Sequence, residues 1–349
     1  MLLLTVFALT VVLVGAEAAV RVRQAIKYGS AKTVEDFYTT DPVSQLRVPI
    51  AGMTSGRITV NQLGFRGPEI ALPKPPGTVR IAFLGASTTW CAEVSSNEKV
   101  WPHIVTSALQ TAFPAVSLDY VNGGVPGYTI RSIQKNLEHR VGLLAPDIIV
   151  IYEGTNDLSG EMRDLAFASG LITDTKFVER SWLETHSLFL HLVVKNLAIL
   201  RAQHAARENR KRLDIDPAKI GSTFRRDLTE LVEAAKKRAN IVAVATFSTQ
   251  LRPGQSTDEQ LGAAVSALFY MPFMSPAGLT QAYARYNEII REVARDTDVL
   301  LIDKADAIPG DPVHFVDTVH FSDAGSERMA SHVIEALTAD PAVRRLLAR

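Results

Sequence analysis

The sequence predicts an α/β fold in which helices cover both faces of a parallel sheet. Five short apolar runs, rich in β-branched residues, alternate along the chain with longer segments of helical periodicity. The runs are almost wholly apolar, as is typical of strands buried on both faces. At 349 residues the chain exceeds a usual single domain but is short for two. We therefore expect one such domain with extensions.

The expected elements alternate regularly from Val79 onward. The strands are expected at 79–84, 117–121, 147–152, 241–246 and 299–302. The helical patterns between and after them lie around 98–112, 130–143, 222–238, 277–295 and 322–337. Such alternation favours parallel strands joined by helical crossovers.

The first 20 residues form the segment best suited to meet a membrane. The apolar run ends at Ala16, and "AEA" at 16–18 has the small-x-small form of a signal-peptide cleavage site. The basic residues Arg21, Arg23 and Lys27 follow the run, which by the positive-inside rule alone favours a cytoplasmic location for the rest of the chain. A buried N-terminal helix is the alternative. We expect 1–22 to be a signal peptide or membrane anchor and the protein to be membrane-anchored or secreted, on the periplasmic or extracytoplasmic side, with the orientation left open.

Two further segments lie outside the regular alternation. Residues 23–76 are rich in turn formers and are expected to be a linker and extended cover. A helical insertion is expected at about 160–220, where an almost wholly apolar helix runs into a basic segment. That helix either packs on the domain, or lies near anionic headgroups or an acyl pocket.

Composition excludes several function classes. The 37 basic and 37 acidic residues give no net charge and no indication of nucleic-acid binding. The single cysteine, Cys91, excludes an internal disulfide and a multi-cysteine metal site, and is expected to be a packing residue. No phosphate-binding glycine motif follows any expected strand, so we expect no cofactor.

Polar, glycine-containing segments follow the expected strands. They read "GAST", "NGGVPGYT" and "YEGTND", and "DTVHFSDAG" precedes the last helix. Ligands of such sheets bind beyond the carboxyl ends of the strands. Ser87 in the first segment needs a base to become a nucleophile, and His320 is the candidate, with Asp317 able to orient its imidazole.

The four segments, in this order, resemble those of the SGNH hydrolases, also called the GDSL lipase/acylhydrolase family. The resemblance covers roughly 79–337, and the upstream "NQLGFRGPEI" is similar to the lead-in of many membrane-anchored bacterial members. It implies a flavodoxin-like α/β/α fold with sheet order 2-1-3-4-5, and a hydrolase domain over about 77–340. It also implies Ser87 as nucleophile, with Gly127 and Asn156 at the second-block and third-block positions and Asp317 and His320 in the last block. Ala86 departs from the family's usual aspartate.

In this assignment the tetrahedral oxyanion would have three donors. These are the backbone N–H groups of Ser87 and Gly127 and the side-chain amide of Asn156. The alternatives are a helix cap at Ser87, a plain turn around Gly127, a helix cap at Asn156 and Asp157, and a structural role for His320. A metal site built from "HFVDTVH" has no further ligand set beside it, so we expect no metal.

The sequence thus predicts a serine esterase that cleaves an acyl ester, acetyl included, through an acyl-serine intermediate. The expected partners are an acylated glycan or lipid and, through the N-terminal segment, a membrane. Two other functions stay open. One is O-acyl transfer by the same residues, and the other is a non-catalytic role in glycan binding or envelope assembly.

Overall fold

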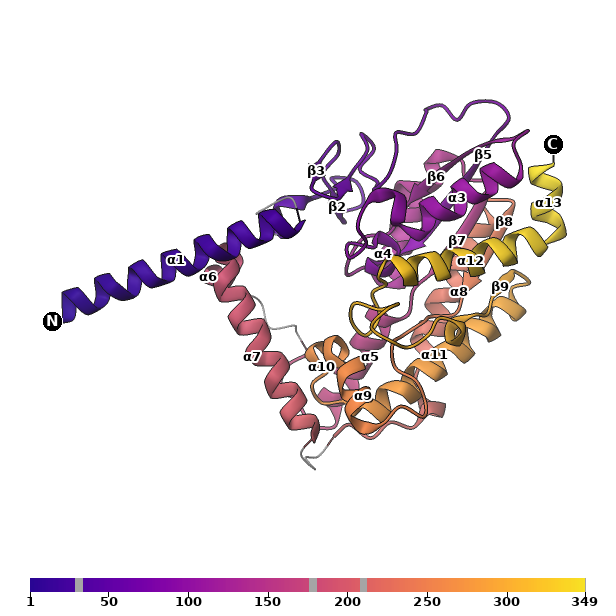
Figure 1. The fold of residues 1–349 in the computed structure, drawn as a ribbon. Helices are drawn as coiled ribbons and strands as arrows, with labels where there is room; N and C mark the ends of the chain where they lie inside the picture. The colour runs from indigo at the N-terminus through magenta and orange to yellow at the C-terminus, as the bar shows by residue number, and fades with distance from the viewer. Residues whose placement is uncertain (29–33, 176–180, 208–211, 349) are drawn as a thin grey trace.

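The chain forms one α/β domain from which a long N-terminal helix projects (Figure 1). The computed structural model describes residues 1–28, 34–175, 181–207 and 212–348. The projecting helix is α1 (Leu2–Tyr28). Its segment Leu3–Ile26 has a mean hydropathy of 2.3 and is long and apolar enough to cross a membrane, and none of it is buried in the structure. At 1.5 Å per residue this segment extends about 36 Å, compared with about 30 Å for the hydrocarbon core of a bilayer.

The domain is built on a five-stranded parallel sheet. Its strands in spatial order are β6 (Ser117–Asn122), β5 (Thr78–Gly85), β7 (Ile148–Tyr152), β8 (Ile241–Ala245) and β9 (Leu300–Ile302). In chain order this is the arrangement 2-1-3-4-5, so the expected flavodoxin-like topology is confirmed. β5 and β7 are buried at every position, as their largely apolar sequences predict. Arg80, the charged residue of β5, is also buried and pairs with Asp119 at 2.7 Å.

Two groups of helices flank the sheet. One consists of α3 (Trp101–Ala112) and α12 (Asp323–Ala339), which contact each other. The short helix α13 (Pro341–Leu347) follows α12 in the chain and packs against it. The other consists of α4 (Ile130–His139), α8 (Ser222–Lys236) and α11 (Pro276–Asp296). Five of these helices, α3, α4, α8, α11 and α12, occupy the positions that the periodicity predicts.

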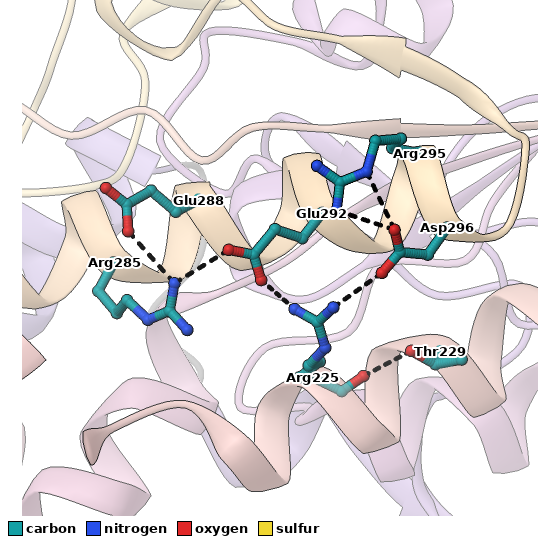
Figure 2. Close-up of polar contacts among 7 residues, drawn as sticks. All are labelled: Arg225, Thr229, Arg285, Glu288, Glu292, Arg295 and Asp296. Atoms are coloured by element: carbon teal, nitrogen blue, oxygen red, sulfur yellow. Dashed lines mark hydrogen bonds and ion pairs between the residues drawn. The ribbon is translucent and has the colours of Figure 1, made fainter. Parts of the chain in front are cut away.

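Ion pairs link α8 to α11 on their outer surface (Figure 2). Arg225 of α8 lies between two carboxylates of α11, pairing with Glu292 and, at 2.8 Å, with Asp296. Arg285 extends the row by pairing with Glu292 and Glu288, each at 3.2 Å. The side chains of Arg225 and Glu292 are 39% and 30% exposed, so water screens the pairs and each contributes little to stability.

Residues 34–77, before the sheet, contain only short elements, whereas residues 23–28, which the sequence assigns to the linker, continue α1. The segment 34–77 contains η1 (Val34–Phe37) and two small hairpins, formed by β1 (Tyr38–Thr40) with β2 (Arg47–Pro49) and by β3 (Thr54–Ser55) with β4 (Ile58–Thr59). Several of its side chains join the core, among them Val48, Val60 and Phe65. It therefore packs on the domain as a cover.

The remaining helices fill the crossovers. They are α2 (Ser87–Trp90), α5 (Thr155–Ala168), α6 (Trp182–His186), α7 (Leu188–Arg207), α9 (Thr257–Ala263) and α10 (Val265–Tyr270). Short 3-10 turns complete the description, at Asn97–Lys99, Val141–Leu144, Pro217–Lys219 and Ala305–Ala307. α7 contacts α1 and α10, and Figure 1 shows it leading from one to the other at the edge of the domain.

Candidate active site

Ser87 lies at the carboxyl end of β5, in the first turn of α2. The strand ends at Gly85, where a Cβ atom would clash with the Thr89 side chain and with the carbonyl oxygen of Tyr152. Only a residue without a side chain lets α2 fold back this closely onto the strand. Ser87 itself is half-buried, while its neighbours Thr88 and Thr89 are buried. The hydroxyl is therefore placed at the edge of the sheet.

Arg66 of the cover segment holds the far end of α2. Its guanidinium is fully buried and donates to the carbonyl oxygens of Trp90, at 2.8 Å, and Cys91, and to Asn97 Oδ1 at 2.8 Å. A guanidinium can satisfy several carbonyls at once because its donors are fixed in a plane. The turn that carries Ser87 is thus supported from outside the block in which Ala86 replaces the usual aspartate.

A continuous chain of hydrogen bonds joins Ser87, His320 and Asp317. Ser87 Oγ lies 2.8 Å from His320 Nε2, and His320 Nδ1 lies 2.9 Å from both carboxylate oxygens of Asp317. Asp317 Oδ1 also accepts from the backbone N–H groups of Val319 and His320, each at 3.0 Å. Because a carboxylate only accepts, Nδ1 carries the proton and Nε2 is free to accept one from Ser87.

Neighbouring negative charges and burial have opposite effects on the pKa of His320. Burial alone lowers the pKa of His320, but the negative charges of Glu93 and Asp317 outweigh it and raise the pKa to about 9. Burial by itself raises the pKa of Asp317, and the imidazolium together with the hydrogen bonds lowers it to about 2. The pair therefore favours the ionised carboxylate and stabilises a proton on the imidazole.

Asn156 lies in the first turn of α5, directly after β7, and Gly127 lies on the loop that follows β6. Asn156 Nδ2 donates to the carbonyl oxygen of Tyr128 at 2.9 Å, which ties the third segment to the second and leaves the other amide hydrogen available. Gly127 is exposed and has a φ of +85°, a conformation that side chains rarely allow. Arg47 of the cover binds the preceding carbonyl of Pro126 at 2.6 Å and so steadies this turn.

Two acidic residues after β7 have roles that differ from a simple cap of the next helix. The sequence favours Asp157 as a cap of α5, but its carboxylate accepts from the N–H of Ile130 at 3.0 Å and thereby caps α4. The N-cap residue of α5 is Gly154, which has no side chain to cap the helix, and the Glu153 side chain accepts from the first turn in its place. Glu153 Oε1 accepts from the N–H of Asn156 at 3.1 Å, and burial raises the pKa of Glu153 to about 8. Glu153 Oε2 is buried and bonds to nothing in the described residues.

The other sequence candidates lie outside this hydrogen-bonded chain. His314 Nδ1 pairs with Asp311 at 2.8 Å, in the same i,i+3 arrangement as the His320 pair. Among the described residues no group of three or more histidine, cysteine or acidic side chains is placed to hold a metal ion. Cys91 is buried, as expected of a packing residue, and burial raises the pKa of its thiol to about 12.

Comparison with known proteins places the fold in a family. Residues 83–328 match the model of the GDSL-like lipase/acylhydrolase family, which is more than half of the chain. The chain belongs to this family. The protein is therefore an ester hydrolase, and its N-terminal apolar helix is compatible with membrane anchoring.

Solved structures of similar architecture accompany this match. An acetylxylan esterase from Geobacillus stearothermophilus is 16% identical, with a TM-score of 0.46 over 74% of this chain and 93% of that one. A lipase/acylhydrolase from Enterococcus faecalis is 18% identical, with a TM-score of 0.44 over 75% and 96% of the two chains. A comparison with curated protein sequences gave no match.

Three residues near the site of this GDSL-like hydrolase carry no motif that the sequence would reveal. Arg66 is a lone basic residue in a turn-rich segment, and Glu93 follows Ser87 by six positions. Glu153 had the clearest signal, because a carboxylate directly after the buried run "IIVIY" is unusual and faces the sheet edge where ligands bind. Their environments depend on contacts between distant segments.

Proposed function

We propose that this GDSL-like hydrolase is a serine esterase that cleaves an acyl ester through an acyl-serine intermediate. The observation that carries the proposal is the 2.8 Å contact between Ser87 Oγ and His320 Nε2, with Asp317 behind the imidazole at 2.9 Å. In this assignment Ser87 is the nucleophile, His320 the general base and Asp317 the group that orients it.

Acylation would begin with transfer of the Ser87 proton to His320 Nε2 as Oγ attacks the ester carbonyl carbon. The new C–O bond forms while the carbonyl π electrons move to oxygen. When the tetrahedral intermediate collapses, the bond to the alcohol oxygen breaks, and His320 returns its proton to that oxygen. The alcohol leaves, and the acyl group remains on Ser87.

Deacylation would repeat these steps with water as the nucleophile. His320 takes a proton from water, hydroxide oxygen bonds to the acyl carbon, and the proton goes to Ser87 Oγ as the acid departs. Asp317 stabilises the imidazolium in both halves without taking up the proton itself. The enzyme is regenerated with no net change in protonation.

The oxyanion of each intermediate would be stabilised by neutral donors. The backbone N–H groups of Ser87 and Gly127 and the free amide hydrogen of Asn156 are assigned to this role. The Asn156–Tyr128 hydrogen bond supports it, because it fixes the amide plane while leaving one hydrogen unused.

The proposed substrate is an acyl ester on a glycan or lipid, met at the extracytoplasmic surface of a membrane that α1 enters. Val313 and Val316 are 65% and 59% exposed, and the N–H of Val316 donates to the carbonyl of His320. An apolar rim beside the base would contact acyl carbons beyond the carbonyl. Its size sets the acyl length that the site accepts.

A panel of chromogenic esters of increasing acyl length, assayed with the full chain and with Ser87→Ala, tests the proposal. We expect hydrolysis by the wild-type protein, a loss of several orders of magnitude in the variant, and a fluorophosphonate adduct on Ser87 by mass spectrometry. An adduct elsewhere, or an active variant, would contradict the nucleophile assignment. Acylated sugar formed in place of free acid would identify a transferase, and no turnover of any ester would favour a binding role.

A further inference from the structure

Helix α7 is largely apolar and yet lies outside the core. The structure describes the burial of 188–201 and 204–205 in this helix, and none of these residues is buried. The exposed large apolar side chains of α6 and α7 are Trp182, Leu183, Val194, Leu197 and Leu200. Exposed apolar side chains that gather on two neighbouring helices are typical of a site of interaction with another phase or molecule.

The N-terminus of α7 is joined to the projecting helix α1 by a specific cap. Glu17 accepts from Ser187 Oγ at 2.8 Å and from the backbone N–H groups of Phe189 and Leu188 at 2.9 and 3.2 Å. Arg21, one turn further along α1, pairs with Glu17 at 2.7 Å and donates to a carbonyl of α6 at 3.1 Å. A carboxylate at this position satisfies free N–H groups and complements the helix dipole.

The position of Glu17 in α1 sets where the cap lies relative to the bilayer surface. Glu17 is the first charged residue of α1 and directly follows the apolar run that ends at Ala16, so we place the bilayer surface at this residue, within the longer segment Leu3–Ile26. From this point α6 and α7 lead sideways, away from the line of α1, to α10 of the domain (Figure 1). The exposed face of α7 therefore starts at the level of the membrane surface.

The chemistry of the two helices fits that surface. Trp182 is 71% exposed, and tryptophan is the side chain that favours the boundary between headgroups and acyl chains. Lys195 and Arg201 are exposed on α7, and Glu184 is the single acidic residue in the sequence from 181 to 207. Apolar and basic side chains together bind anionic lipid surfaces.

We propose that α6 and α7 rest on the surface of the bilayer that α1 enters, held there by Glu17. Their apolar side chains lie among the upper acyl carbons, and Lys195 and Arg201 contact anionic headgroups. The arrangement requires an uncleaved α1, because cleavage after Ala18 would remove Glu17 and leave the α7 N-terminus uncapped. This inference does not depend on the chemistry at Ser87.

Fluorescence quenching in anionic liposomes tests lipid contact in the full chain. Leu197→Cys is labelled with an environment-sensitive fluorophore, and the buried Cys91 remains as in the wild type. We expect a blue-shifted emission that nitroxide-bearing lipids quench strongly and aqueous iodide quenches weakly. The matched control is Leu143→Cys, on the domain surface and 66% exposed, whose label should show the opposite pattern.

Two outcomes would overturn the proposal. A Leu197 label that iodide quenches as readily as the Leu143 label would place α7 in water. Protection from both quenchers would mean that a second copy of the chain, or another protein, covers the helix.

Glu17→Ala in the Leu197→Cys background tests the cap. Lipid quenching should fall several-fold, because α7 is released from α1, whereas Arg23→Ala, a neutral replacement of an exposed residue on α1, should leave it unchanged. Full lipid quenching in the Glu17 variant would overturn the role of the cap. The intact mass of the wild-type protein from membranes should include residues 1–18, and a mature N-terminus at Ala19 would overturn the arrangement directly.

Discussion

At the scale of single residues, the proposed role of His320 as general base predicts how the activity depends on pH. Only a neutral imidazole accepts the Ser87 proton, so activity is lost as pH falls below the His320 pKa, which is raised to about 9. We expect kcat/KM to rise from neutral pH towards this value. Glu93→Gln removes a negative neighbour of the imidazolium and should move the midpoint of the profile to lower pH. A midpoint one pH unit lower would give about tenfold more activity at pH 7.

The matched control for Glu93 is Glu98→Gln, a change of the same charge at an exposed position of the same loop. Its kcat/KM profile should keep the wild-type midpoint. A Glu93 variant with an unchanged midpoint would show that its carboxylate does not act on His320.

Substitution of Asn156 tests whether its side-chain amide stabilises the oxyanion. The amide would bond more strongly to the developing alkoxide than to the ground-state carbonyl, so Asn156→Ala should lower kcat by about 10²–10³-fold with little change in KM. Asn156→Asp should be worse, because a carboxylate repels the oxyanion. A variant that keeps its kcat and loses mainly thermal stability would assign Asn156 to the loop contact with Tyr128 alone.

At the scale of elements, Arg66 couples the cover segment to the turn that carries Ser87. Arg66→Lys replaces a planar guanidinium by a single ammonium, which cannot reach all of the carbonyls that Arg66 satisfies. We expect a destabilisation of about 1–3 kcal/mol and a slower reaction of Ser87 with fluorophosphonate in the folded protein. Arg80→Lys is the control, because Arg80 is equally buried but lies near the other end of β5, paired with Asp119.

The Arg80 variant should unfold more easily and keep the wild-type rate of fluorophosphonate reaction. Equal rates in the Arg66 variant and the wild type would mean that Arg66 supports the fold without positioning Ser87.

The row of ion pairs between α8 and α11 makes a second element-scale prediction (Figure 2). Glu292 pairs with arginines of both helices, so Glu292→Ala should lower the free energy of unfolding by about 0.5–1 kcal/mol in urea at low salt. The loss should shrink at high salt, where screening already weakens the pairs. Glu288→Ala, which removes one exposed partner of Arg285, should cost less. A cost independent of salt would indicate lost packing.

The elements that the sequence predicts well are those whose pattern is local and repetitive. The apolar runs of β5 and β7 and the periodicity of α11 identify themselves, and parallel topology then brings the polar segments to one edge. α9 lies outside the predicted alternation, although Ser256 and Glu259 form a capping box that the sequence displays. Arg66 and Glu93 act through contacts between distant segments, which no local pattern records, whereas Glu153 is marked by its place directly after a buried run.

At the scale of the whole molecule, the cover and the sheet form one folding unit, while α1 contacts α6 and α7 at the edge of the domain. A fragment that begins near Lys27 should therefore be soluble and retain esterase activity. A fragment that begins at the first strand of the sheet lacks Arg47 and Arg66, and we expect it to unfold at a lower temperature and to turn over ester poorly. Equal melting temperatures for the two fragments would contradict the role given to the cover.

α1 is joined to the rest of the molecule twice, through the chain that follows Tyr28 and through the contacts of Glu17 with α7. A domain attached to its membrane anchor at a single point can rotate relative to the membrane. In the proposed arrangement the two attachments restrict this rotation, which fixes the distance of Ser87 from the bilayer and the direction in which its crevice opens. Such an enzyme works on a layer of fixed thickness. Its effective substrate concentration is then set by how many esters lie in that layer and hardly by their concentration in bulk solution.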